Sequence, residues 1–513
     1  MKKIIVLVVI IISLIIGGVF ILRNIGSDDD VSNEVEADVD DVIEVIEPEP
    51  EIRIKSLASD ITLEISEEEV VYIKNENLIQ LNYLEGLYRF VYQYDEENNQ
   101  LIWVYEDQTY LFNFNSNQYS VNGEGSYNND ILIKKGGTIY VSLEMLQNKF
   151  NMSYFLIEDP LFSLQIEFNS EGGQTYLIRE LMNGIKESMP DKITMTWEAV
   201  YSRKTDVSSL YDMPGLDVIS PVWYEVVDSD GQLKLKTQDD YIQWAREKDY
   251  DLWPAVTNSF DPDMTRDIIS SIETRTQVIN QLTDIYSENG FEGINIDFEN
   301  IYKDDKDKLS QFIAELTAAF HRKGMLVSMD VTFGGGSDNW SKCYDRKVLG
   351  EWVDYIVVMS YDEHWGSSPI SGSVASLNWL DKNLELLINE VDSNKVIMGI
   401  PFYMRVWFER PHKENVNQMK VTSDAITMHK MESILSAGDY NVLWDEAAGQ
   451  NYISFIDFAD NAVKKVWIED AESLKLKIDM VHKYNLKGIA SWRRGYELES
   501  IWPILEEALE KGE

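Results

Sequence analysis

Hydrophobic and polar positions alternate strictly at 294–299, directly after a Gly-rich turn at 290–293. A period of two predicts a β-strand with one apolar and one polar face. The apolar face holds Ile294, Ile296 and Phe298, and the polar face holds Asn295, Asp297 and Glu299. An ordinary surface strand would alternate too, but strands usually avoid Asp and Asn. Because helical patterns flank the strand on both sides, we expect a parallel sheet whose polar row points into a barrel, where charge is costly unless it is used.

The rhythm of strand followed by helix continues from about residue 190 to residue 513. Helical patterns at 266–289 and 305–323 separate apolar runs that we interpret as strands. Eight such strands predict an α/β fold, a (β/α)8 TIM barrel: 193–197, 216–221, 252–256, 294–298, 326–330, 355–359, 396–400 and 488–492. The gap between strands seven and eight is too long for a loop. It carries its own helix and strand signals, so we expect a small α+β insertion at about 406–470.

The N-terminal stretch 1–26 predicts a membrane anchor. Lys2 and Lys3 precede an uncharged run from Ile4 to Leu22, which is longer than the apolar core of a signal peptide, about 7–15 residues. The two lysines favour a cytoplasmic N-terminus and an extracytoplasmic catalytic part facing the cell wall. The alternative is a cleaved signal peptide and a secreted protein.

Residues 27–55 are rich in Asp and Glu and predict a disordered, self-repelling linker. Short alternating segments then predict a small α+β domain at 56–170. Its expected strands lie at 70–73, 88–94, 101–105, 109–114 and 139–141, and its expected helix lies at 143–150.

Composition excludes several classes of partner. The 513 residues carry a formal net charge of −44, which repels nucleic acid and anionic membrane surfaces. Cys343 is the single cysteine, so no intramolecular disulfide can form, and a buried, idle thiol is the simplest interpretation. The five histidines form no metal-binding motif. We therefore expect neither a metal nor another cofactor.

Polar and aromatic residues gather where the predicted barrel strands end, and that is where barrel enzymes place their active sites. Strand four ends in Asp297 and Glu299, and strand eight ends in Trp492. The other strand ends contribute Trp197 and Glu198 after strand one, Asn258 after strand three, Met359, Tyr361 and Asp362 after strand six, and Tyr403 and Arg405 after strand seven.

Taken together, and in their order along the chain, these segments resemble glycoside hydrolase family 18, the chitinase-like enzymes. Stretch 290–299 is similar to the family signature Asp-Gly-x-Asp-x-Asp-x-Glu, with Glu292 and Asn295 where the family usually has Asp. The segments 359–362 and 401–405 match Met-x-Tyr-Asp and Pro-x-Tyr-x-Arg. The local sequences at 220–223, 361–365 and 491–497 resemble those of the spore-germination branch of the family. The resemblance covers about residues 192 to 509.

A second, short resemblance concerns the small domain. Residues 141–144 and 161–168 are similar to the N-terminal domain of copper amine oxidases. Because the segment 56–170 contains no histidine, a copper site there is implausible. A wall-binding, spacing or dimerising role stays open.

The family 18 resemblance implies hydrolysis of β-linked N-acetylglucosamine in chitin or peptidoglycan, and the anchor favours peptidoglycan. Asp297 and Glu299 share one strand face and cannot straddle the anomeric carbon. In this family the nucleophile is the 2-acetamido oxygen of the substrate. Glu299 would be the acid, Asp297 and Tyr361 would hold the acetamido group, and Trp492 would stack under the sugar, with the other strand-end residues and Asn295 lining the site. Asn295 removes a carboxylate, which predicts a simpler titration.

Two competing interpretations remain open at this point. The chain could be a barrel that binds glycan without cutting it, although such family members typically lose the catalytic Glu, which is present here as Glu299. It could also be a wall scaffold that acts through the domain at 56–170, in which case the barrel would be dispensable.

Overall fold

The computed structural model describes residues 50–55, 60–150, 152–158, 162–168, 173–201, 204–412 and 419–510. The predicted anchor and most of the acidic stretch therefore lie outside the described residues. Within the described ranges, no helix is both long enough and apolar enough to cross a bilayer.

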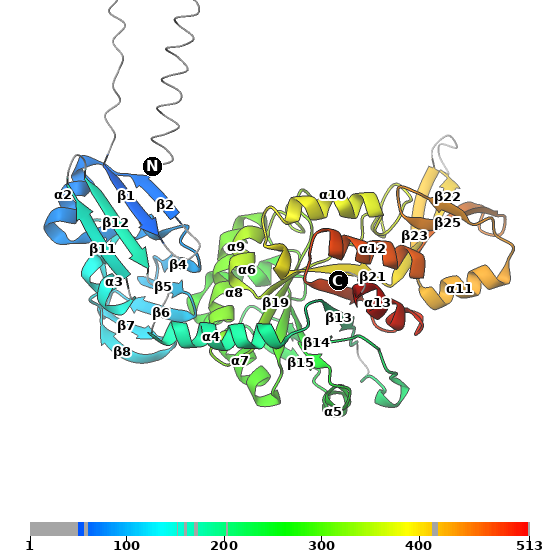
Figure 1. Cartoon of the computed structure of the whole chain (residues 1–513), viewed down its shortest axis with the longest axis horizontal. Helices are drawn as coiled ribbons and strands as arrows, with labels where there is room; N and C mark the ends of the chain where they lie inside the picture. Colours follow the sequence, from blue (N-terminus) through cyan, green and yellow to red (C-terminus); the bar gives the residue numbers. More distant parts are fainter. Residues whose placement is uncertain are drawn as a thin grey trace, which may run out of the picture. The chain divides into compact units, whose positions relative to one another are not determined.

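Eight parallel strands close into a barrel (Figure 1). They are β13 (Ile193–Glu198), β14 (Val218–Val226), β17 (Ala255–Thr257), β18 (Gly293–Asp297), β19 (Leu326–Val331), β20 (Tyr355–Val358), β21 (Val396–Pro401) and β27 (Gly488–Trp492). Each strand pairs with the next in chain order, and β27 pairs with β13 to close the ring. Two short strands pair with β14: β15 (Leu233–Leu235) runs antiparallel to it and β16 (Asp251–Leu252) runs parallel to it. The predicted TIM barrel is confirmed.

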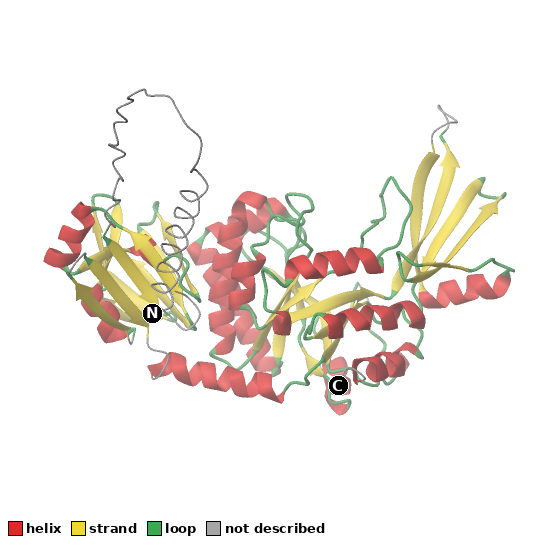
Figure 2. Cartoon of the chain, turned by 45° about the horizontal axis from the view of Figure 1, so that its top comes forward, coloured by secondary structure: helices red, strands yellow, loops and turns green. Residues whose placement is uncertain are grey.

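Helices pack against the barrel strands (Figure 2), most of them on the outside, whereas Ile178 and Met182 of the helix at 173–188 pack with lumen side chains such as Trp197. They are α4 (Gly173–Ser188), α5 (Asp239–Glu247), α6 (Pro262–Ser270), α7 (Ile272–Asn289), α8 (Lys306–His321), α9 (Arg346–Trp352), α10 (Leu377–Leu387), α12 (Ala471–Lys483) and α13 (Ile501–Glu510). The pattern predicted one helix at 266–289, but Ser271 divides it, because its side chain caps α7 by accepting from Thr274 N–H.

The apolar face of β18 packs outward against these helices, as the alternation predicts. Ile294 and Ile296 are fully buried, and Phe298 stacks on Phe312 of α8 with ring centroids 5.6 Å apart. The same alternation turns Asn295 and Asp297 into the barrel. The strand therefore presents its polar row to the lumen because its other face forms the core.

The predicted insertion lies between β21 and β27. It consists of β22 (Tyr403–Pro411), β23 (Met419–Thr427), α11 (Met428–Ala437), β24 (Leu443–Asp445), β25 (Gln450–Asp457) and β26 (Ala462–Ile468). The strands form one antiparallel sheet in the order β23-β22-β26-β25-β24, with α11 beside it (Figure 2).

The N-terminal domain contains three sheets. A five-stranded meander holds β4 (Phe90–Asp95), β5 (Gln100–Tyr105), β6 (Gln108–Asn113), β7 (Gln118–Val121) and β8 (Glu124–Asn128). The other two combine β1 (Glu51–Lys55), β2 (Asp60–Glu64), β11 (Met152–Ile157) and β12 (Ser163–Phe168), and β3 (Leu78–Gln80), β9 (Leu132–Lys135) and β10 (Thr138–Ser142). Helices α2 (Glu67–Glu76) and α3 (Leu143–Lys149) complete the domain.

Two local predictions for this domain are wrong. Residues 70–73, expected as a strand, lie in α2, because Ser66 and Glu69 form a capping box that starts a helix. The predicted linker extends too far, because residues 51–55 form β1. That strand buries Ile52 and Ile54 and pairs with β12, more than 100 residues further along the chain.

The meander packs against α8 and α9 of the barrel (Figure 1). Val104 of β5 is fully buried with Ala314, Ala318 and Trp352. At the same contact, His321 at the end of α8 is buried between Asp107 of the N-terminal domain and Asp354. The N-terminal domain and the barrel thus share a packed interface with charged groups inside it.

Candidate active site

Asp297 ends strand β18, and Glu299 follows it at the rim of the barrel. Asn258, directly after β17, fixes the backbone of Glu299. Its side-chain amide donates to the Glu299 carbonyl at 2.8 Å and accepts from the Glu299 N–H at 3.0 Å. Because Asn258 is buried and also donates to Thr265, its polar atoms are all occupied. Asn258 therefore supports the backbone of the predicted acid, and its contact with substrate stays a prediction.

Asn295 lies one layer deeper and is fully buried. Its side-chain oxygen accepts from the Trp197 indole N–H at 2.9 Å, and its amide nitrogen donates to Asp330 at 2.7 Å and to Ser328 at 3.1 Å. Asn295 and Trp197 thus bond to each other beneath the site. Both residues were expected to line the substrate site. In the structure, the indole N–H of Trp197 and the side-chain amide of Asn295 form hydrogen bonds inside the lumen.

Burial governs the electrostatics of the carboxyl groups. It raises the pKa of Asp297, whose Oδ1 is buried without a hydrogen-bond partner in the described structure. Burial also raises the pKa of Glu299, and the nearby charges of Asp297 and Asp362 raise it further. A raised pKa favours the protonated form of Glu299, which is the form that a general acid needs.

Tyr361 lies at the end of β20, and glycine at position 399 of the neighbouring strand leaves room for its ring. A Cβ at Gly399 would lie 2.6 Å from the Val358 carbonyl oxygen and 3.1 Å from Tyr361 Cε1. Burial, and after it the charges of Tyr403, Asp330, Asp297 and Glu299, raise the pKa of Tyr361 well above its ordinary value. Tyr361 therefore keeps its proton and can act as a hydrogen-bond donor close to the carboxyl row.

Asp362, Tyr403 and Arg405 form one cluster at the rim. Asp362 Oδ1 accepts from the Tyr403 hydroxyl at 2.7 Å and from the Arg405 guanidinium at 3.2 Å. Asp362 has a φ of 58°, a left-handed backbone that is uncommon outside glycine. Such backbone strain often marks functional sites, and here the two donors hold the residue in place.

Trp492 at the end of β27 is partly exposed and meets Trp197 edge to face, with ring centroids 5.8 Å apart. One of its surfaces is therefore available for stacking. Glu198 is buried in an ion pair with Arg494 and accepts from Thr205 at 3.3 Å, so it holds the loop after β27. The contact of Glu198 with substrate stays a prediction. Met359 is partly exposed beside Tyr361.

Sequence reasoning missed Asp330, which is buried and bonded to Asn295. The signal was present, because Ser328 and Asp330 repeat on β19 the polar alternation that drew attention to β18. The expectation of a simpler titration stays a prediction, and it did not count the carboxyl group of Asp330. Position 295 lacks a carboxyl group, but Asp330 of β19 provides one nearby. The charge of Asp297 contributes to raising the pKa of Asp330.

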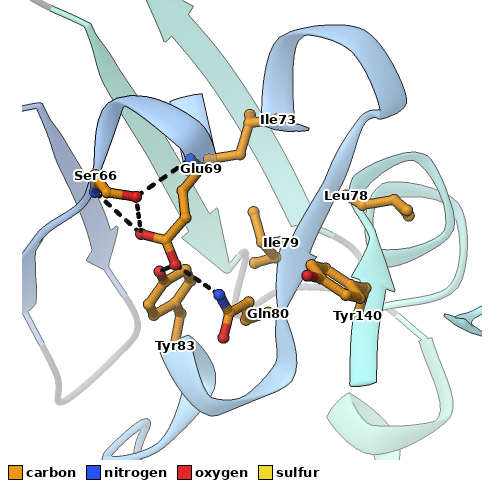
Figure 3. Close-up of a pocket in the computed structure, with 8 residues that line it drawn as sticks. All are labelled: Ser66, Glu69, Ile73, Leu78, Ile79, Gln80, Tyr83 and Tyr140. Carbon is orange, nitrogen blue, oxygen red and sulfur yellow. Dashed lines mark hydrogen bonds between the residues drawn. The ribbon is translucent and has the colours of Figure 1, made fainter. Parts of the chain in front are cut away.

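Across the described ranges, no group of three or more His, Cys, Asp or Glu side chains is arranged to hold a metal ion. A pocket of about 300 Å³ lies in the N-terminal domain (Figure 3). Its one carboxylate, Glu69, already accepts from Ser66, Gln80 and Tyr83. The carboxylate of this pocket is therefore already held by side chains of its own domain.

Comparison with known proteins finds related glycosylases. The chain is 27% identical over 289 residues to a glycosylase of Bacillus subtilis, YvbX, covering 54% of this chain and 80% of that protein. It is 24% identical over 252 residues to the cortical fragment-lytic enzyme of Bacillus subtilis, covering 48% of this chain and 57% of the relative.

Two solved structures share the fold. The spore cortex-lytic enzyme SleL of Bacillus megaterium aligns with a TM-score of 0.55 at 21% identity, over 76% of this chain and 88% of its own. A chitinase of Chromobacterium violaceum aligns with a TM-score of 0.53 at 20% identity, over 63% of this chain and 98% of its own. The model of the glycosyl hydrolases family 18 matches residues 176–497, which contain the barrel and every site residue above. The chain belongs to glycosyl hydrolases family 18 and is a glycoside hydrolase.

Proposed function

We propose that this hydrolase cleaves β-linked N-acetylglucosamine polymers with retention, using the 2-acetamido group of its substrate as the nucleophile and Glu299 as the general acid. One observation carries the proposal: the carboxyl groups of Asp297 and Glu299 belong to one wall of the barrel. A protein nucleophile would have to attack the sugar from the side opposite the acid. Asp362, the other rim carboxylate, is bound by Tyr403 and Arg405.

The reaction would then proceed in two steps. Glu299 gives its proton to the leaving oxygen while the acetamido oxygen bonds to C1, which forms a cationic oxazolinium ring. Asp297 accepts a hydrogen bond from the acetamido N–H, and Tyr361 donates one to the acetamido oxygen. Water next gives a proton to Glu299 and adds to C1 while the ring bond breaks, so the anomeric configuration is retained.

Reducing-end release from glycan by the purified extracytoplasmic part, with Glu299→Gln as the matched inactive control, tests hydrolysis itself. A thiazoline mimic of the cyclised sugar should inhibit strongly, because it resembles the bound intermediate. A glycan without the acetyl group should not be turned over. Efficient cleavage of the fully deacetylated glycan would contradict substrate assistance.

Peptidoglycan is the favoured substrate, with chitin as the alternative. The relative named a cortical fragment-lytic enzyme and the predicted membrane anchor both support a cell-wall glycan and an extracytoplasmic location. Mass spectrometry of the products from peptidoglycan and from chitin oligomers distinguishes the two. Products from chitin oligomers alone would overturn the preference.

A non-catalytic glycan-binding protein is the competing function. The raised pKa of Glu299, the buried Asp297 and the donor Tyr361 are evidence against it, because binding alone does not require a carboxyl group whose pKa is raised. Glycan binding without any reducing-end release would favour it. A wall scaffold acting through the N-terminal domain would tolerate loss of the barrel.

A further inference from the structure

The carboxyl row of β18 continues onto the neighbouring strand β19. The two parallel strands pair Asn295 with Ser328 and Ile296 with Met329. The same register, carried one residue further, sets Asp297 opposite Asp330. Neighbouring strands of a sheet lie about 4.8 Å apart, so residues at matching positions on one face are neighbours. Asp297 and Asp330 therefore face each other inside the barrel.

Asn295 orients Asp330 and is itself held in one orientation. Its oxygen accepts from Trp197 and Ser220, so its nitrogen must point toward Ser328 and Asp330. An ionised Asp at position 295 could not donate to Asp330 and would place three carboxylates together. The amide at 295 and the carboxyl group at 330 are thus complementary, which gives a physical reason for the departure from the usual family signature.

Asp297 and Asp330 have the surroundings of a pair that shares a proton. Asp330 is 1% exposed, and Asp297 Oδ1 is buried without a partner in the described structure. Two adjacent carboxyl groups in such a place do not both ionise. Burial, followed by the charge of Asp297, raises the pKa of Asp330 well above its ordinary value. A proton between the two would satisfy the unpartnered oxygen.

We propose that Asp330 is a positioning residue of the hydrolysis, which shares one proton with Asp297 and so supplies from β19 the carboxyl group that position 295 lacks. This rests on the proposed role of Asp297. When the proton lies on Asp330, Asp297 carries the negative charge that attracts the acetamido N–H and the oxazolinium. When the product leaves, the proton can return. The proton stays within the pair, so the overall reaction consumes none.

The test uses two variants of the full-length protein. Asp330→Asn keeps the shape of the side chain and removes its proton exchange. The double variant Asn295→Asp with Asp330→Asn moves the carboxyl group back to β18. We expect Asp330→Asn to lower kcat on the order of 10-fold to 100-fold with little change in KM, less than the about 10²–10⁴-fold typical of losing a proton donor. The double variant should recover most of that loss.

Two readouts separate proton sharing from a structural role. The pH profile of kcat/KM should lose one ionisation in Asp330→Asn and regain it in the double variant. The titratable groups facing Asp330 are Asp297, Glu299, Tyr344 and Tyr361, and both variants retain all four. Wild-type kcat and an unchanged profile in Asp330→Asn would overturn the proposal. So would equal loss in both variants when their thermal unfolding matches the wild type.

Infrared difference spectra make the test independent of turnover. A protonated carboxyl band present at neutral pH in the wild type should weaken in Asp330→Asn and reappear in the double variant. An unchanged band in Asp330→Asn would overturn the proposal. Absence of glycan hydrolysis by the wild type would instead contradict the proposed function, while the infrared result would still decide whether Asp330 holds the proton.

Discussion

Replacing His321 by Leu should weaken the contact between the N-terminal domain and the barrel in a pH-dependent manner. His321 Nδ1 lies 2.8 Å from Asp107 of the N-terminal domain, and its Nε2 lies 3.0 Å from Asp354. Only the imidazolium can donate from both ring nitrogens. The structure therefore requires a charged histidine, and its position at the C-terminal end of α8 favours the same charge.

The pKa values of the three groups agree with this assignment. Burial lowers the pKa of His321, but the charges of Asp354 and Asp107 outweigh burial and raise it above its ordinary value. Burial raises the pKa of Asp107, but the charges of Arg89 and His321 outweigh burial and lower it to about 2. Burial also raises the pKa of Asp354, but His321 and Lys186 outweigh burial and lower this pKa below its ordinary value.

The magnitude follows from the buried geometry. The side chains of His321, Asp107 and Asp354 are 3%, 6% and 2% exposed, so solvent screens them little. Removing one partner of a buried ion pair costs about 3–5 kcal/mol. Two hydrogen bonds to charged groups, at about 1.5–3 kcal/mol each, give a similar figure. At roughly 4 °C per kcal/mol for a domain of this size, the transition of the N-terminal domain should fall by about 12–20 °C.

The pH dependence has a defined sign. Because the folded pKa of His321 is raised, its stabilisation is complete below the unfolded value of 6.5 and is lost as pH rises through the folded pKa. The lowered carboxyl pKa values act oppositely, and their stabilisation is lost as pH falls below the unfolded value of 3.8. The interface should therefore be most stable between about pH 4 and pH 6.5.

Calorimetric unfolding between pH 5 and pH 9, with limited proteolysis of the domain junction, measures this effect. His482→Leu is the matched control, because His482 makes one hydrogen bond to the Ala508 carbonyl, worth about 1 kcal/mol. The wild type and the control should lose stability as pH rises, and His321→Leu should lack that dependence. The same pH dependence in His321→Leu as in the wild type would refute the reasoning.

Four further predictions concern catalysis and location. Glu299→Gln should lower kcat by about 10²–10⁴-fold while glycan binding and unfolding stay near wild type, because the amide keeps the shape but supplies no proton; near-normal activity would identify another acid. Tyr361→Phe should lower the rate on the order of 10²-fold by removing one donor to the acetamido oxygen, and an unchanged kcat would contradict that role. Activity should fall on the alkaline side as Glu299 loses its proton at its raised pKa, and Asp297→Asn should move this limb of kcat/KM to lower pH, because it removes a charge that raises that pKa; a limb that stays in place would contradict the coupling. The intact mass of protein extracted from membranes should include the run from Ile4 to Leu22, whereas a mature N-terminus beyond Leu22 would indicate a signal peptide.

The sequence by itself determined the barrel and the carboxyl pair at its rim. Strand and helix periods are local, so the alternation of apolar and polar residues predicted the eight strands and turned Asp297 into the lumen. Because the C-terminal ends of parallel strands meet at one face of a barrel, Glu299, Tyr361 and Trp492 could be grouped from their positions after strands four, six and eight.

Only the tertiary structure decided which side chains pair across the lumen and between the domains. Asn258 supports Glu299, and Asp330 stands beside Asp297, because neighbouring strands adopt one particular register. His321 meets Asp107 214 residues away, because the N-terminal meander packs against α8. A local pattern records which face a residue takes, but the partner on that face comes from a segment that becomes adjacent only when the chain folds.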